Sequence, residues 1–512
     1  MSYFENLAKK AKSVAPLERP MDLQEKPAGA DEGKVLVDSY GDVKIYKDSR
    51  EAVLVYEVPV PHYKGGEKQL IDALLQIAIS VLPADSGALT QEEKRKRYFD
   101  KIMEIIEKSP ELSVPIHSRN FYAEAVVREM VGYSLIDALV GDDQLEEIMI
   151  VGPGKPVYVF HRKYEMMKTN IIFYEDSDIR NLVERIGRAV GRRIDVQVPM
   201  LDARLPDGTR VNATFPPASI DGSTLTLRKF RKDPLSVIDL INYGTLDFET
   251  AALLWVATDG LGAYPANVLI AGGTASGKTT TLNVLCSFVP NSERIVTIED
   301  TAELSLPLEH WLRMEVRPPS LEGTGEITMN DLVKNSIRMR PDRIIVGEIR
   351  GEEGYTMFAA MNTGHRGVMG TVHANSAQET LVRIASPPIN VPSVMISALN
   401  LIVMQNRIHD RRLGTLRRVT EIAEVVTLDV GKPEIQVTHS WDPVKDKMST
   451  TGVDSIFFQL LRKYTGLSND GILAELKERE NLLRQLSQNG IRGTKEICSV
   501  TQSYIMRKKL SI

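Results

Sequence analysis

Residues 268–285 read VLIAGGTASGKTTTLNVL, an apolar strand-like run followed by a glycine-rich segment and then by residues that favour a helix. The glycine-rich segment, residues 272–279, matches the pattern G-x-x-x-x-G-K-[ST] at every fixed position. Small residues let backbone N–H groups close around a phosphate, and the first turn of the helix adds a partial positive charge. The stretch therefore predicts a phosphate-binding loop (P-loop) between a buried strand and a helix.

The P-loop makes specific residues candidates for nucleotide binding. We expect Lys278 to reach the β- and γ-phosphates of a nucleotide and the Thr279 hydroxyl to ligate Mg²⁺. The predicted cofactors are therefore ATP and Mg²⁺. The predicted cofactor-binding residues are Gly272, Thr274, Ala275, Ser276, Gly277, Lys278, Thr279 and Thr280.

Other apolar runs in this half of the chain also end in polar residues. Glu299, Glu348 and His373 each follow such a run. The carboxyl ends of parallel strands share one edge of an open sheet, and ligands bind at that edge. We therefore expect these three side chains to lie around the P-loop, in an α/β fold with a mainly parallel sheet and crossover helices.

Glu299 and Glu348 are the predicted catalytic carboxylates. A single glutamate after a strand usually caps a helix, but two beside a P-loop indicate nucleotide hydrolysis, in which one polarises the attacking water and the other holds a metal-bound water. The residues alone do not assign the two roles. Many P-loop enzymes carry an aspartate at the second position, so direct ligation of the metal by Glu348 also stays open.

Two histidines, His365 and His373, stand eight positions apart with no cysteine nearby. Zinc would need further ligands, so a zinc site is not expected. His373 at a strand end is expected to act as a polar relay or to sense the γ-phosphate. The alternative is a structural histidine whose hydrogen bonds are satisfied inside the fold.

Two arginines in the first half of the chain are candidates of a different kind. Arg210 lies in a predicted turn, and Arg228 follows the strand-like residues 225–227. Arginines on exposed strands are usually partners in surface salt bridges. The residues alone therefore do not place Arg210 or Arg228 in an active site.

Composition along the chain indicates three parts. Residues 1–34 are rich in proline and glycine and predict a flexible arm, with a short amphipathic helix that touches lipid or a partner as the alternative. Residues 35–232 show short strands, turns and a charged helix, which favours an α+β domain. Residues 233–512 carry the P-loop and the alternating strands and helices, and they end in a helical tail.

The overall composition argues against several classes of protein. With 43% hydrophobic and 26% charged residues, the 512-residue chain has the composition of a multidomain globular protein. Its net charge of −5 provides no basic footprint, so no nucleic-acid partner is expected. The two cysteines suit a reducing compartment. The sequence shows neither a secretory signal nor the roughly 18–20 apolar residues of a membrane span, so we expect a cytoplasmic protein.

Together these segments resemble the type II/IV secretion ATPase superfamily over roughly residues 130–430. Four motifs of that superfamily occur in order: a Walker A loop at 272–279, an Asp box at 297–304, an atypical Walker B at 339–350 and a His box at 363–376. Three more segments are similar to archaeal members, including the archaellum motor ATPases: 206–212, 228–230 and 442–448. The four-cysteine zinc insert of many bacterial relatives does not occur in this sequence.

This resemblance implies a RecA-like C-terminal domain, an N-terminal domain that covers the nucleotide, and a hexameric ring. Arg210 and Arg228 match the arginine fingers of the family. Glu299 matches its general base, and Glu348 matches the Walker B carboxylate that supports Mg²⁺. Nucleotide binding would close the two domains about a hinge near Asp233, and hydrolysis would be coupled to a domain rotation that pushes on a polytopic membrane platform protein. The chain is therefore expected at the inner face of the cell membrane.

The implied function is ATP hydrolysis by a motor that assembles an archaeal type IV filament such as the archaellum. An archaeal pilus or a type II/IV secretion system is the alternative within the same superfamily. A nucleotide-switched scaffold is a hypothesis of another class, and the intact Lys278, Thr279, Glu299 and Glu348 argue against it. A DNA translocase is the third hypothesis, and the acidic balance of the chain counts against it.

Overall fold

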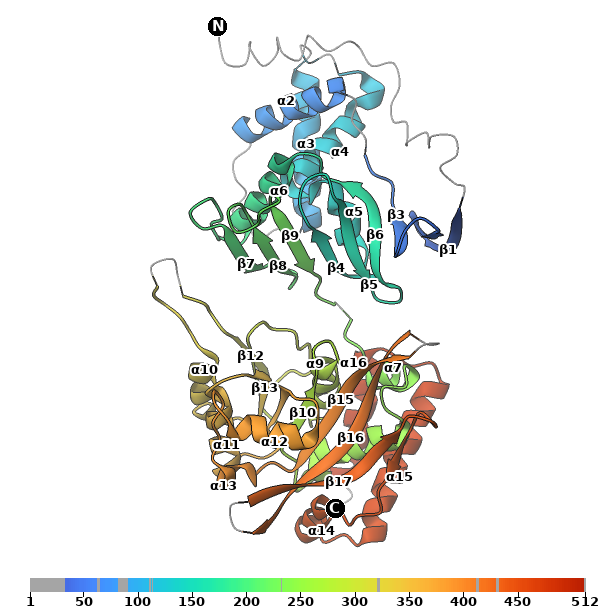
Figure 1. The fold of residues 1–512 in the computed structure, drawn as a ribbon, viewed down its shortest axis with the longest axis vertical. Helices are drawn as coiled ribbons and strands as arrows, with labels where there is room; N and C mark the ends of the chain where they lie inside the picture. The colour runs from blue at the N-terminus through green and yellow to red at the C-terminus, as the bar shows by residue number, and fades with distance from the viewer. Residues whose placement is uncertain are drawn as a thin grey trace. The chain divides into compact units, whose positions relative to one another are not determined.

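The computed structural model describes residues 33–510 except for short gaps at 62–64, 82–90, 110–111, 113, 232, 320–322, 411–413 and 430–431. The predicted arm, residues 1–34, lies outside the described residues apart from Gly33 and Lys34, and Lys34 already begins a strand. The chain divides into two compact units, one that ends at Arg231 and one from residue 232 onward (Figure 1).

The first unit is built on a nine-stranded sheet with the order β1-β2-β3-β6-β5-β4-β9-β8-β7. Its strands are β1 (Lys34–Tyr40), β2 (Val43–Asp48), β3 (Leu54–Glu57), β4 (Leu145–Ile150), β5 (Pro156–His161), β6 (Glu165–Ile172), β7 (Met200–Arg204), β8 (Arg210–Thr214) and β9 (Thr224–Arg228). Strands β3 and β6 pair in parallel, and the other neighbours pair antiparallel. Alternate side chains such as Val157 and Val159 enter a core with Ile179 and Leu182 of α6 (Asp176–Ala189). The predicted α+β architecture is confirmed.

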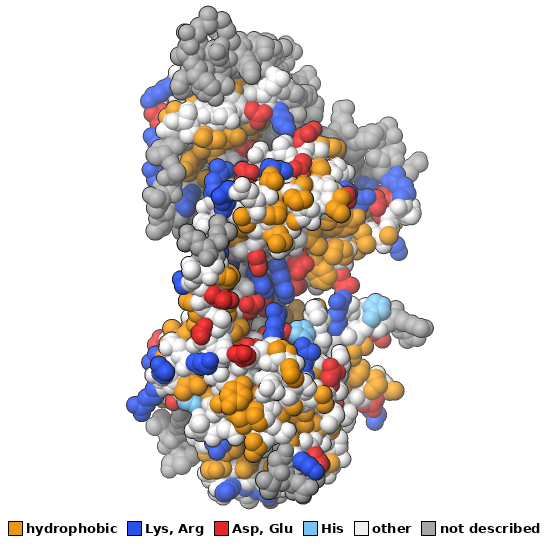
Figure 2. All heavy atoms as spheres, turned by 60° about the vertical axis from the view of Figure 1, so that its left-hand side comes forward, with side chains coloured by type: hydrophobic (Ala, Val, Ile, Leu, Met, Phe, Trp, Pro, Cys, Tyr) orange, Lys and Arg blue, Asp and Glu red, His pale blue; other side chains and the backbone are white. Residues whose placement is uncertain are grey.

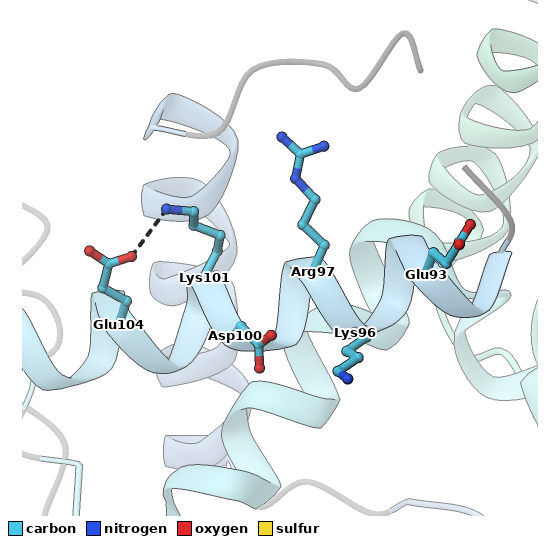
Figure 3. Close-up of a pocket in the computed structure, with 6 residues that line it drawn as sticks. All are labelled: Glu93, Lys96, Arg97, Asp100, Lys101 and Glu104. Atoms are coloured by element: carbon cyan, nitrogen blue, oxygen red, sulfur yellow. Dashed lines mark hydrogen bonds and ion pairs between the residues drawn. The ribbon is translucent and has the colours of Figure 1, made fainter. Parts of the chain in front are cut away.

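Helices α2 (Gly65–Val81), α3 (Gln91–Lys108) and α4 (Arg119–Val131) form a second core in this unit, and the short α5 (Asp137–Gly141) follows them. Helix α3 buries Ile102 and Ile106. Its outer face carries the charged residues shown in Figure 3, where Lys101 and Glu104 form an ion pair at 3.2 Å. Within the charged run at residues 92–97, Glu93, Lys96 and Arg97 are exposed, whereas Lys94 and Arg95 are half-buried.

The second unit contains another nine-stranded sheet, with the order β12-β11-β13-β14-β10-β15-β16-β17-β18. Its strands are β10 (Val268–Gly272), β11 (Ile295–Glu299), β12 (Trp311–Glu315), β13 (Arg343–Ile349), β14 (Met369–His373), β15 (Leu401–Asp410), β16 (Gly414–Asp429), β17 (Lys432–Asp442) and β18 (Lys447–Thr450). The six strands from β12 to β15 in this order run parallel, which confirms the predicted parallel sheet.

Strands β16 to β18 differ from the expectation that strands and helices alternate as far as residue 430. They extend the sheet as antiparallel hairpins. Only residues 411–413 connect β15 to β16. A parallel neighbour would need a crossover of roughly a dozen residues, so the short connection permits only antiparallel pairing.

Helices cover both faces of this sheet. They are α7 (Val237–Asn242), α8 (Phe248–Asp259), α9 (Lys278–Cys286), α10 (Met329–Ile337), α11 (Glu353–Asn362), α12 (Ala377–Ala385), α13 (Ser393–Ile396), α14 (Ile456–Thr465), α15 (Asn469–Gln488) and α16 (Thr494–Leu510). One core joins one face of the sheet to α7 to α9 and to the C-terminal helices, and a second core joins the other face to α10 to α13 (Figure 1). Strand β10 is buried along its whole length because it lies between both layers.

A buried ion pair attaches the helical tail to the second unit. Arg479 of α15 and Asp259 of α8 are each 3% exposed in their side chains, and Arg479 Nη2 donates to Asp259 Oδ2 at 2.9 Å. The Arg479 guanidinium also lies 5.3 Å from the ring centroid of Trp255 and 5.0 Å from that of Tyr504. The tail is therefore an integral part of this unit.

We expect Arg479→Ala to lower the free energy of unfolding of the second unit by about 3–5 kcal/mol, because the Asp259 charge would stay buried without its partner. All three tryptophans of the chain lie in this unit, so urea unfolding followed by tryptophan fluorescence measures it. Arg484→Ala on the same helix is the matched control. Its side chain is 48% exposed, so a loss below about 1 kcal/mol is expected. Equal losses in both variants would contradict the prediction.

The surface of the described chain is mixed in character. On the face that Figure 2 shows, acidic and basic side chains lie interspersed with hydrophobic ones over both units. Every helix in the described part of the chain is too short or too polar to span a lipid bilayer.

Candidate active site

The P-loop connects β10 to α9 at the carboxyl edge of the parallel strands. Gly277 has φ 95° and precedes the first residue of α9, and no side chain caps this helix. Its first N–H groups are therefore available to a ligand, as phosphate binding requires. A Cβ added to Gly273 would meet open space, so the loop leaves room beside its backbone for a phosphate.

Lys278 lies within this loop. Its side chain is buried, with the residue 7% exposed, and Nζ donates to the carbonyl oxygens of Gly272 at 3.0 Å and Gly273 at 2.8 Å. Burial lowers the pKa of the Lys278 amine, and the nearby Glu348 charge partly offsets this effect. The ammonium is thus already positioned at the loop backbone by two hydrogen bonds.

The remaining predicted P-loop residues divide into two groups. Ser276 is buried and its hydroxyl donates to the Gly273 carbonyl at 2.9 Å, which braces the loop. Thr274 and Ala275 are exposed, and Thr279 and Thr280 are half-buried at the start of α9. A threonine hydroxyl and one carboxylate are donors that Mg²⁺ accepts when substrate phosphates and water complete its shell, so Thr279 and Glu348 fit the predicted metal.

Glu299 ends β11 and is 2% exposed. Its Oε1 accepts hydrogen bonds from the backbone N–H groups of Glu303 at 2.9 Å and Leu304 at 3.0 Å, whereas its buried Oε2 has no partner among the described residues. Burial raises the pKa of Glu299 to about 7, although the two N–H groups act against this rise. Gly347 makes room for the side chain, since a Cβ there would lie 2.9 Å from Cγ of Glu299.

Glu348, next to that glycine on β13, has a different environment. Its Oε2 accepts a hydrogen bond from Arg350 Nη2 at 2.7 Å, and His373 Nε2 lies 2.8 Å from Oε1. Burial alone would raise the pKa of Glu348, but Arg350, His373 and Lys278 outweigh burial and hold this pKa below its usual value. The environments therefore suit Glu299 to accept a proton near neutral pH and Glu348 to stay ionised.

The two histidines lie at opposite ends of β14. His373 ends the strand beside Glu348, and burial together with the Lys278 charge lowers the pKa of its imidazole. His365 lies before the strand begins, at the other edge of the sheet.

The structure brings the two predicted arginines together in the first unit. Arg210 begins β8 and Arg228 ends β9, where they are direct cross-strand neighbours. Arg210 thus lies in a strand, whereas the sequence predicted a turn. Arg228 Nε lies 3.8 Å from Oε1 of Glu147 on β4. The P-loop, the two carboxylates and His373 all belong to the second unit.

Two residues at the site were not predicted. Arg350 binds Glu348 and also lies 3.8 Å from Asp300, so it joins the ends of β13 and β11. Gln405 on β15 lies against Gly272. Gln405 follows the apolar residues 401–404, so the polar-after-strand signal that identified Glu299 could have found it.

Comparison with known proteins gives consistent similarities. A family model described as "Type II/IV secretion system protein" matches residues 129–431. An uncharacterized protein of Methanocaldococcus jannaschii is 33% identical over 73% of this chain and 75% of its own length. A putative conjugal transfer protein of Mycobacterium tuberculosis is 36% identical over 50% of this chain and 73% of its own. The crystal structure of the pilus retraction motor PilT with bound ADP covers 68% of this chain and 87% of its own, with 18% identity and a TM-score of 0.41.

Proposed function

The chain belongs to the type II/IV secretion system protein family, and from this premise we propose that it is a Mg²⁺-dependent ATPase that works as a hexameric motor. The motor drives assembly of an archaeal type IV filament, such as the archaellum, through a membrane platform protein. The observation that carries the proposed hydrolysis is the buried Glu299 carboxyl at the P-loop edge, with an unpaired Oε2 and a pKa of about 7.

Each site residue of the second unit has a distinct role in this proposal. The P-loop N–H groups and Lys278 hold the phosphates. Thr279 and Glu348 would hold Mg²⁺, and the bound ion would offset the charge of the phosphates. Glu299 accepts a proton from the attacking water through Oε2. His373 and Arg350 keep Glu348 in position and ionised.

Arg210 and Arg228 complete the proposed catalytic set as arginine fingers. Their guanidinium groups would stabilise the charge that develops on the transferred phosphoryl group. Because they lie in the other unit, the set is complete only when a first unit covers the nucleotide. Domain closure would then couple hydrolysis to work on the platform protein, with the chain held peripherally at the inner face of the membrane.

A secretion or conjugal-transfer motor is the second candidate function. The relative from Mycobacterium tuberculosis carries the name of a putative conjugal transfer protein, which favours it. The similarity of segments 206–212, 228–230 and 442–448 to archaeal motor ATPases supports the filament motor. Electron microscopy of a deletion mutant that lacks this protein separates the two functions. Loss of surface filaments supports the filament motor, and intact filaments with a secretion defect support the alternative.

We expect Arg210→Ala to lower kcat for ATP hydrolysis by at least about 100-fold, because an arginine finger acts in the transition state. ATPase activity per chain should rise with protein concentration in the wild type as the ring assembles. Phosphate release at several protein concentrations measures both effects. Arg193→Ala, in the same unit and paired with Asp195, is the control and should keep wild-type activity. Full activity of Arg210→Ala would remove this residue from the proposed site.

A further inference from the structure

Strand β15 supports the P-loop from the side. It pairs in parallel with β10, with Ala271 opposite Met404, so Gln405 follows beside Gly272. A Cβ on Gly272 would lie only 2.0 Å from the backbone oxygen of Gln405. Only glycine therefore fits at position 272, and the backbone of Gln405 holds the beginning of the loop against the sheet.

The Gln405 side chain reaches the other end of the loop. The residue is 1% exposed, and its Oε1 accepts a hydrogen bond of 2.6 Å from the hydroxyl of Thr281, itself buried in α9. The Gln405 amide nitrogen would lie 2.8 Å from a Cβ on Gly277. One side chain thus contacts the glycine that ends the loop and the first turn of the helix that follows.

Arg417 holds the middle of the loop from β16. Its Nε donates to the carbonyl oxygen of Ala275 at 3.0 Å. Ala275 has φ 57°, a left-handed conformation that residues other than glycine rarely adopt. A hydrogen bond from outside the loop stabilises such a conformation, so this contact fixes the part of the loop that is least stable by itself.

We propose that Gln405 and Arg417 form a clamp that keeps the P-loop in its phosphate-binding shape, and that both are positioning residues for the nucleotide. The clamp rests on the proposed nucleotide binding and extends it to strands β15 and β16. The physical reason is preorganisation: backbone N–H groups already ordered around the phosphate position avoid the entropy cost of ordering the loop on binding. The clamp acts at the beginning, the middle and the end of the loop.

The test measures the dissociation constant of ADP for the full-length chain by titration calorimetry, with and without Mg²⁺. Arg417→Ala is expected to weaken ADP binding about tenfold, as loss of a hydrogen bond from a charged group does. Arg417→Lys should recover part of the affinity. Arg407→Ala is the matched control, because Arg407 is the cross-strand neighbour of Arg417 on β15, where it carries the same charge.

A second pair of variants tests the Gln405 arm. Thr281→Val keeps the shape of the side chain but removes the hydroxyl donor, and Thr281→Ser keeps the donor. We expect weaker ADP binding in Thr281→Val and near wild-type binding in Thr281→Ser. The unfolding midpoint without nucleotide, followed by tryptophan fluorescence, identifies any variant whose fold is lost.

The outcomes separate the clamp from the proposed function. ADP binding by the wild type, weakened in Arg417→Ala but not in Arg407→Ala, supports the clamp. Equal affinities in Arg417→Ala, Arg407→Ala and the wild type overturn it, while nucleotide binding itself stands. A wild-type chain that binds neither ADP nor ATP contradicts the proposed function, whatever the variants do.

Discussion

Replacement of Lys278 by alanine is expected to lower kcat/KM for ATP hydrolysis by at least about 1,000-fold, because the site loses the cation nearest the phosphates. Two hydrogen bonds to the loop carbonyls of Gly272 and Gly273 already position this ammonium, and the residue is 7% exposed. No other lysine occurs in the P-loop, residues 272–279, to replace it. Steady-state phosphate release with saturating Mg²⁺ measures the loss.

The control for this variant is Lys495→Ala, which removes the same charge from an exposed position of α16. It should keep wild-type activity. Tryptophan fluorescence checks that Lys278→Ala is folded. A folded Lys278→Ala variant that keeps more than about a tenth of the wild-type kcat/KM would show that the P-loop is not the site of hydrolysis.

Glu299→Gln is expected to lower kcat by roughly 100- to 10,000-fold, the range typical for loss of a general base. Gln has nearly the same volume, and its amide oxygen can still accept the hydrogen bonds from Glu303 and Leu304. Nucleotide affinity should therefore stay close to that of the wild type. Single-turnover hydrolysis together with ADP titration separates the chemical step from binding.

The pKa of Glu299 also gives this variant a pH signature. The base must be ionised to accept a proton, and its pKa is raised to about 7, so wild-type activity should rise with pH from 6 to 8 and then level off. The small residual activity of Glu299→Gln should lack this step. Glu309→Gln, at an exposed position after β11, is the control and should keep the wild-type profile. A wild-type rate that is constant from pH 6 to 8 would contradict the assignment.

The free energy of unfolding should change with pH in the opposite sense to activity, so it should fall as the pH rises. The folded state binds the Glu299 proton more tightly than the unfolded chain does. Protonated Glu299 therefore contributes fully to the free energy of unfolding below about pH 4.5, and this contribution is lost as pH rises through about 7. Relative to Glu299→Gln, the wild type should lose about 3 kcal/mol in unfolding free energy by pH 8 to 9. Urea unfolding of both proteins at pH 5 and pH 8.5 measures this difference.

Local sequence patterns predict those parts of the site that a few adjacent residues are enough to specify. Residues 268–285 specify a strand, a tight loop and a helix, and the structure contains β10, the P-loop and α9 in that order. The strands that precede Glu299, Glu348 and His373 are equally local features. Parallel pairing then places their carboxyl ends at one edge, so the neighbourhood of these residues follows from a general rule of sheet geometry.

Other features depend on contacts between residues far apart in the chain. Gln405 meets Thr281 across 124 positions, and Arg417 meets Ala275 across 142. No local pattern distinguishes Arg417 from any other arginine in a strand. The antiparallel pairing of β16 with β15 follows from the short connection at residues 411–413, which the expected alternation of strands and helices overlooked.

The sequence by itself determined the P-loop, the α/β fold of the second half and the polar residues at its strand ends, because periodicity and glycine spacing act over a few residues. Tertiary structure alone decided the difference between Glu299 and Glu348. The Glu299 carboxyl is enclosed beside Gly347 and accepts hydrogen bonds from backbone N–H groups, whereas the Glu348 carboxyl lies between Arg350 and His373. A pKa depends on burial and on neighbouring charges, and folding sets both by bringing distant segments together.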